Sequence, residues 1–114
     1  RAVLQSLMAS NGAEQMIEIA RTEKDPDLRR TAIRNLGSIG TTATRDSLRA
    51  IYTSDSSPEV RRAVIDGLSR QDAAATLVEL ARIEKAPALK QEIVRRLANI
   101  KSKEATDFLL ELLK

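Results

Sequence analysis

The 114-residue sequence contains no cysteine and no histidine, and one tyrosine and one phenylalanine are its only aromatic residues. Without cysteine the chain has no disulfide and no thiolate nucleophile, and without histidine it has no imidazole base. Most zinc sites are excluded as well, because cysteine and histidine are their usual ligands. The scarcity of aromatic rings means that any core must consist of leucine, isoleucine, valine and alanine.

Long apolar segments are also missing. No run approaches the roughly 20 residues that span a bilayer, and no secretory leader is visible. The sequence begins at Arg1 rather than at methionine, so we expect it to be a fragment, and any targeting signal would lie outside it. The absence of cysteine means that no oxidising compartment is needed. The localisation stays open, with the cytoplasm slightly favoured.

The remaining composition is that of a globular chain. Hydrophobic residues make up 42% of it and charged residues 31%, with a net charge of +3. A chain of this size can bury a core without disulfides or metals. The mildly basic balance permits an acidic partner without requiring one.

Three prolines mark an internal repeat with a spacing of about 30 residues. Each proline is followed two positions later by an aliphatic residue and three positions later by a basic one. A leucine stands ten positions after each proline, and the aliphatic positions before each proline also match. The prolines are Pro26, Pro58 and Pro87, and the leucines are Leu36, Leu68 and Leu97.

Each repeat unit is predicted to be a pair of helices, helix A before the proline and helix B after it. Apolar residues recur with a period of 3.6 in both segments, which is typical of amphipathic helices. Proline is favourable in the first turn of a helix, and Asp25 and Ser57 precede it as N-cap residues, whereas Ala86 does not. Gly37 and Gly40 lie where helix B should end.

The predicted fold is all-α, a right-handed α–α superhelix, or solenoid, of antiparallel helix pairs. One domain is expected over residues 1–114, as part of a longer array. Its units are a partial unit at 1–12, full units at 13–40, 43–71 and 72–101, and a partial unit at 104–114. The predicted helices cover 1–9, 13–24, 27–39, 43–54, 58–70, 72–85, 87–100 and 104–114.

The proline-centred motif resembles that of HEAT repeats, particularly the short bacterial form also found in phycobilisome-lyase-type proteins. Pro58-Glu59-Val60-Arg61 and Pro26-Asp27-Leu28-Arg29 carry the resemblance, and the third copy departs from it with Lys90 in place of arginine. The resemblance covers essentially the whole chain. It implies that Arg29 and Arg61 form a structural ladder between repeats, and that the B helices line a concave face.

The sequence offers little for catalysis. The predicted A helices contain two pairs of carboxylates, and the members of each pair are four residues apart: Glu14 with Glu18, and Asp107 with Glu111. Paired carboxylates can act as acid and base, but these lie among other charges and are expected to be solvated surface. We therefore expect no enzyme activity, no cofactor and no metal site.

The functional hypothesis is based on how charged residues are distributed between the A and B segments. The B segments hold ten basic and four acidic residues, while the A segments are more acidic. On a concave face the B segments would form a basic groove, and some of these charges could instead only serve solubility. The candidate groove residues are Arg30, Arg34, Arg62, Arg95 and Arg96.

The main hypothesis is a protein–protein interaction scaffold whose basic concave face binds an acidic segment or helix. A nucleic-acid-binding solenoid is one alternative, which the lack of aromatic residues for stacking disfavours, and a structural spacer in a larger enzyme is another. No membrane partner is expected. The last helix could self-associate through an apolar face with no helix B beside it, formed by Phe108, Leu109, Leu112 and Leu113.

Overall fold

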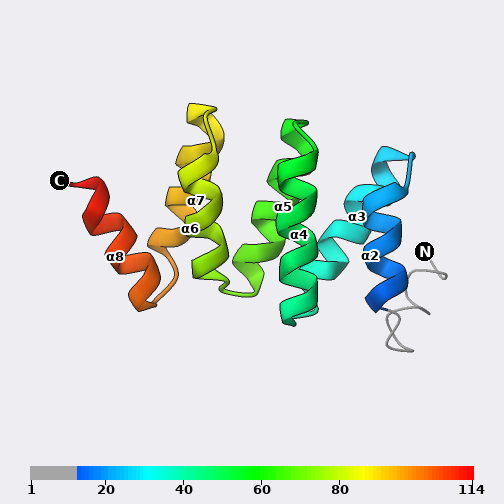
Figure 1. The fold of residues 1–114 in the computed structure, drawn as a ribbon, viewed down its shortest axis with the longest axis horizontal. Helices are drawn as coiled ribbons and strands as arrows, with labels where there is room; N and C mark the ends of the chain where they lie inside the picture. Colours follow the sequence, from blue (N-terminus) through cyan, green and yellow to red (C-terminus); the bar gives the residue numbers. More distant parts are fainter. Residues whose placement is uncertain (1–12) are drawn as a thin grey trace.

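The computed structural model describes residues 13–114, and this part of the chain forms seven α-helices and no strand (Figure 1). The all-α prediction is confirmed for these residues. The helix expected over 1–9 and the partial unit expected over 1–12 lie outside them. The helices are α2 (Ala13–Thr22), α3 (Pro26–Gly37), α4 (Thr42–Ser54), α5 (Pro58–Arg70), α6 (Ala74–Ile83), α7 (Pro87–Ala98) and α8 (Lys103–Leu112).

The helices lie in two layers and follow one another along the molecule (Figure 1). The A layer contains α2, α4, α6 and α8, and the B layer contains α3, α5 and α7. Each helix packs against the next helix in the chain, and also against its neighbours in the same layer. The result is an elongated body of 48 × 25 × 17 Å. This arrangement is the α-solenoid that the repeat predicts.

A proline begins every helix of the B layer. The first residues of α3, α5 and α7 are Pro26, Pro58 and Pro87. In α3, the Asp25 carboxylate accepts hydrogen bonds from the amides of Asp27 at 2.9 Å and Leu28 at 3.4 Å, as an N-cap residue does. Ser57 is the N-cap residue of α5, as expected, but its hydroxyl forms no capping hydrogen bond and donates instead to the Glu59 carboxylate at 2.9 Å.

The core lies between the two layers and is almost entirely aliphatic. The leucines ten positions after each proline are completely buried, as the amphipathic stripe predicts. Tyr52 and Phe108, which lie in A helices, are buried as well. Repeating positions in the sequence thus supply repeating layers of one continuous core, whose fully buried leucines are Leu36, Leu48, Leu68, Leu77, Leu80 and Leu97.

Two glycines allow α3 and α5 to approach closely. A Cβ atom on Gly37 would lie 2.5 Å from the Cα of Gly67, so no larger residue fits there without displacement. Neither glycine has a positive φ, and Gly37 therefore serves helix contact rather than the left-handed turn typical of glycine at helix ends. In α7 the position of Gly67 is taken by Arg96, nine residues after the proline. Accordingly α7 packs less closely on α5 than α5 packs on α3.

The last helix, α8, packs against α6 and α7 and leaves its far side open. Phe108, expected on the open face, is only 3% exposed, so this expectation is wrong. Its ring instead faces α6, where the Arg82 guanidinium carbon lies 5.1 Å from the ring centroid. Leu109, also expected on that face, is only half-buried, and the exposed leucines are Leu110, Leu112 and the C-cap residue Leu113.

Candidate partner-binding groove

A shallow groove of about 600 Å³ crosses the B layer, with walls from α3, α5 and α7. Four of the five arginines selected from the sequence line it, which places them on one surface. Five arginines face two carboxylates there, so the groove has an excess of positive charge. Its lining residues are Arg30, Arg34, Glu59, Arg62, Ala63, Asp66, Arg70 and Arg96.

The helical period explains why these side chains meet. Arg30 and Arg34 are four residues apart and therefore share one face of α3. Arg62, Asp66 and Arg70 follow the same spacing along α5. Arg70 was not among the residues selected from the sequence, although its spacing from Arg62 was visible there.

Asp66 connects the two halves of the groove. Its carboxylate pairs with Arg70 on the same helix at 3.0 Å and with Arg96 of α7 at 3.3 Å. Arg96 also donates to Glu92 at 3.0 Å. These contacts hold Arg96 between α5 and α7, so its charge is already largely compensated.

Arg34 and Arg62 have exposed side chains and no ion-pair partner among residues 13–114. Residues 1–12 contain no acidic side chain at all. Arg30 pairs only with Asp27 of its own helix. The pKa of Glu59 is held below its usual range by hydrogen bonds from its own amide and the Ser57 hydroxyl, and to a smaller extent by the charges of Arg30 and Arg62. Arg62 thus lies near Glu59 without forming an ion pair, and the exposed guanidinium groups of Arg34 and Arg62 remain accessible to a ligand.

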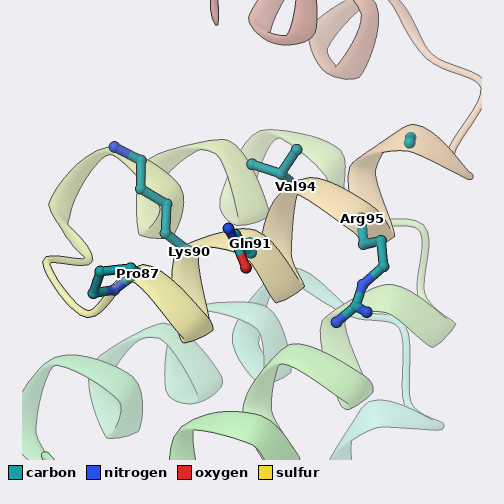
Figure 2. Close-up of a pocket in the computed structure, with 6 residues that line it drawn as sticks. Pro87, Lys90, Gln91, Val94 and Arg95 are labelled. Atoms are coloured by element: carbon teal, nitrogen blue, oxygen red, sulfur yellow. The ribbon is translucent and has the colours of Figure 1, made fainter.

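Arg95 does not face this groove. Its side chain is 71% exposed and pairs with Glu92 on its own helix. It lies instead beside a separate apolar hollow of about 480 Å³ along α7, with Pro87, Lys90 and Val94 (Figure 2). The structure therefore brings four of the five candidate arginines together and places the fifth elsewhere.

Arg29 and Arg61 connect successive units beneath the surface. The Arg29 Nε donates to the carbonyl of Ala20 at 2.7 Å, and its guanidinium pairs with Asp55 of the next unit. The Arg61 Nε donates to the Asp55 carbonyl at 2.9 Å, and its Nη1 pairs with Glu84 of the following unit at 2.9 Å. Each arginine thus connects the end of the A helix in its own unit with the end of the A helix in the next unit.

A family model for HEAT repeats matches residues 13–73, from the start of α2 to the beginning of α6. This span is more than half of the 114-residue chain. The chain belongs to the HEAT-repeat family. HEAT repeats are commonly protein-interaction scaffolds and are typically non-catalytic. A comparison with curated proteins gave no match.

Over residues 13–114, Glu84 is the most buried charged residue, with 6% of its surface exposed. Burial opposes its charge, but hydrogen bonds from the Tyr52 hydroxyl and the Ala86 amide, together with Arg61, keep the pKa of Glu84 below its usual value. Burial and Glu84 raise the pKa of Tyr52 far above its usual value. The Arg61 guanidinium also lies 4.7 Å from the Tyr52 ring centroid.

The paired carboxylates of the A helices lie on the surface of the HEAT array. Glu14 is exposed, and the others form surface ion pairs: Arg21–Glu18, Lys103–Asp107 and Arg82–Glu111. Over residues 13–114, His, Cys, Asp and Glu side chains form no group of three or more that could hold a metal ion. Within the same range, no helix has the length and apolar character to cross a bilayer.

Proposed function

We propose that this HEAT-repeat chain is a protein-interaction scaffold that binds an acidic segment of its partner in the groove across α3, α5 and α7. The observation that carries the proposal is the pair of free guanidinium groups, Arg34 and Arg62, in a groove with five arginines and two carboxylates. An uncompensated charge on a groove wall favours a ligand of opposite sign.

The chemistry of the groove favours carboxylates. Each guanidinium presents a planar set of N–H donors that can bind both oxygens of a carboxylate. Packed helices lie about 8 to 10 Å apart, so the groove extends over roughly 16 to 20 Å from α3 to α7. An extended segment of about five or six residues, or about three turns of a helix, covers this distance.

Nucleic acid is less suited to this groove. Single strands are bound by aromatic side chains on which the bases stack, and both aromatic residues, Tyr52 and Phe108, are buried in the core. Since neither aromatic side chain is available to stack on a base, the groove favours a protein ligand over single-stranded nucleic acid.

The test is a titration of the chain with a fluorescently labelled peptide rich in aspartate and glutamate, followed by fluorescence anisotropy. Binding is expected at low salt and should weaken as salt screens the charges. Replacement of Arg62 by glutamate should weaken binding about tenfold or more, because an attractive contact becomes repulsive.

Arg95→Glu is the matched control, since it changes the net charge equally at an exposed arginine outside the groove. It should leave the affinity within about twofold of the original chain. Equal losses in the two variants would contradict the groove assignment. Tighter binding of duplex DNA than of the peptide would favour the nucleic-acid alternative, and no binding to either ligand would favour a structural spacer.

A further inference from the structure

One residue of the groove departs from the repeat. Eight positions after the proline, α3 and α7 each have an arginine, but α5 has Asp66. Asp66 lines the groove between Arg62 and Arg70, which stand four residues before and after it and therefore share its helix face. With an arginine at this position, Glu59 would be the only acid among the described residues that line the groove.

Asp66 holds two arginines, one with each oxygen of its carboxylate. Its Oδ2 pairs with Arg70 of the same helix at 3.0 Å, and its Oδ1 accepts a hydrogen bond from Nη1 of Arg96 at 3.3 Å. Arg96 also pairs at 3.0 Å with Glu92, an acid that it shares with Arg95. We call Asp66, Arg70, Arg96 and Glu92 the Asp66 cluster. Two anions face two cations in this cluster, so its arginines present little uncompensated charge to a ligand.

The uncompensated charge of the groove therefore lies outside the Asp66 cluster. Arg34 and Arg62 are exposed and form no ion pair with any residue in the range 13–114. Such guanidinium groups can bind a carboxylate without first losing another partner. The groove thus contains two kinds of arginine, accessible ones outside the Asp66 cluster and occupied ones within it.

We propose that Asp66 determines which acidic segments the groove selects. By neutralising Arg70 and Arg96, it restricts the acidic contacts of a partner to Arg34 and Arg62. The preferred ligand is then a segment with a short acidic stretch, such as a pair of carboxylates flanked by uncharged residues, and a longer acidic run gains nothing from its additional charges. This inference rests on the proposed function, because it concerns the ligand of the same groove.

Competition within the chain is the physical reason for the restriction. Asp66 belongs to the folded chain, so it binds its arginines without the loss of translational freedom that a ligand carboxylate incurs. A ligand that displaced it would also leave the Asp66 carboxylate, which is 30% exposed, unpaired beside a second negative charge. Like charges in contact oppose binding. Arg34 and Arg62 have no such competitor, so the first acids of a ligand bind there.

The experiment compares two labelled peptides of equal length by fluorescence anisotropy. One has glutamates throughout, and the other has a single pair of glutamates among serines. The titrations are made near physiological salt, where screening limits long-range attraction. The original chain should bind both peptides with affinities within about threefold of each other. Binding of the peptide with one glutamate pair tests the proposed function, and the ratio of the two affinities tests the inference.

Asp66→Asn should raise the affinity ratio in favour of the fully acidic peptide by about fivefold or more, because it removes the competing charge. Arg96 keeps its pair with Glu92, so the charge that becomes available is mainly that of Arg70. Adding Arg70→Gln to this variant should therefore remove most of the gain. A purely structural role of Asp66 would change the binding of both peptides equally and leave the ratio unmoved.

Asp46→Asn is the matched control. It makes the same change of charge on α4 in the A layer, where Asp46 is 64% exposed and lies 3.8 Å from Arg49, and it should leave the ratio unchanged. An unchanged ratio in Asp66→Asn would overturn the inference and leave the proposed function standing. Absence of binding of either peptide to any of these chains would refute both.

The comparison on the original chain needs no variant, so it stays decisive if Asp66→Asn unfolds the protein. A preference of about tenfold or more for the fully acidic peptide would overturn the inference, because it would show that additional acids find partners in the Asp66 cluster. Similar affinities for the two peptides would support it.

Discussion

At the scale of single residues, buried charges hold successive HEAT units together. Glu84 accepts hydrogen bonds from Tyr52, Arg61 and the Ala86 amide, so its charge is compensated from three directions. Removing such a buried acceptor is costly, because the buried donors that it pairs with are then left without a hydrogen-bond partner. The ladder therefore links units through contacts whose removal affects two helices at once.

Replacing Glu84 with glutamine should lower the free energy of unfolding by about 2 kcal/mol near neutral pH, because charge-assisted hydrogen bonds are lost. The pKa of Glu84 is lower in the folded chain, so its ionised form contributes stability above its usual pKa. This contribution disappears as the pH falls through the lowered value. Urea unfolding, followed by circular dichroism at a series of acidic pH values, should show the difference from the original chain shrinking.

Glu79→Gln provides the control for this prediction. Glu79 pairs with Arg49 at 3.0 Å, but its side chain is 55% exposed, and exposed pairs contribute little to stability. The control should unfold almost as the original chain does at every pH. A loss in the Glu84 variant that matches the control, or that stays constant on acidification, would contradict the assigned role.

At the scale of helices, the spacing of the B layer depends on which residue lies at each contact. Gly37 and Gly67 bring α3 and α5 together, whereas Arg96 stands at the equivalent position between α5 and α7. An arginine needs room and a counter-charge, and Asp66 supplies the latter at 3.3 Å. Arg96 therefore lines the groove together with residues of α3 and α5, at a contact where α5 and α7 pack less closely than α3 and α5 do.

Replacing Gly37 with alanine should destabilise the chain by about 1 to 3 kcal/mol, although alanine is the better helix former. The new Cβ would meet the Cα of Gly67, which cannot rotate away as a side chain could. Chemical unfolding measures the loss. Gly40→Ala is the control, because no atom lies within 4 Å of its added Cβ, and a similar loss in both variants would argue against the close contact.

At the scale of the whole molecule, the array is stabilised by contacts between neighbours. Each inner helix is covered on both sides, while α8 contacts only α6 and α7. In such a linear arrangement the local free energy of opening depends on how many neighbours cover a helix. The end of the array should therefore open more readily than its centre.

Amide hydrogen exchange should be faster in α8 than in α5, because fewer contacts have to break for α8 to open. Mass spectrometry of peptic fragments measures this difference. Exchange in α8 as slow as in α5 would show that the exposed leucines do not weaken this end.

The sequence by itself determined the fold class and most of the helix boundaries. The period of about 30 residues, the prolines and the aliphatic stripe are local signals, so helix type and the burial of Leu36, Leu68 and Leu97 follow from them. Helix starts agree within two residues of the observed ones, and five of the seven helix ends were predicted two residues too late. End positions depend on fraying and on contacts with other helices.

Only the tertiary structure decided which charges share a surface. Arg95 and Arg96 are adjacent in the sequence, yet Arg96 lines the groove and Arg95 lines the separate apolar hollow along α7, because successive residues point about 100° apart around a helix. The rotation of α7 against α5 is set by packing with residues far away in the chain. Packing between distant residues also explains why Arg70 lines the groove and why Phe108 packs toward α6 rather than toward the open side of α8.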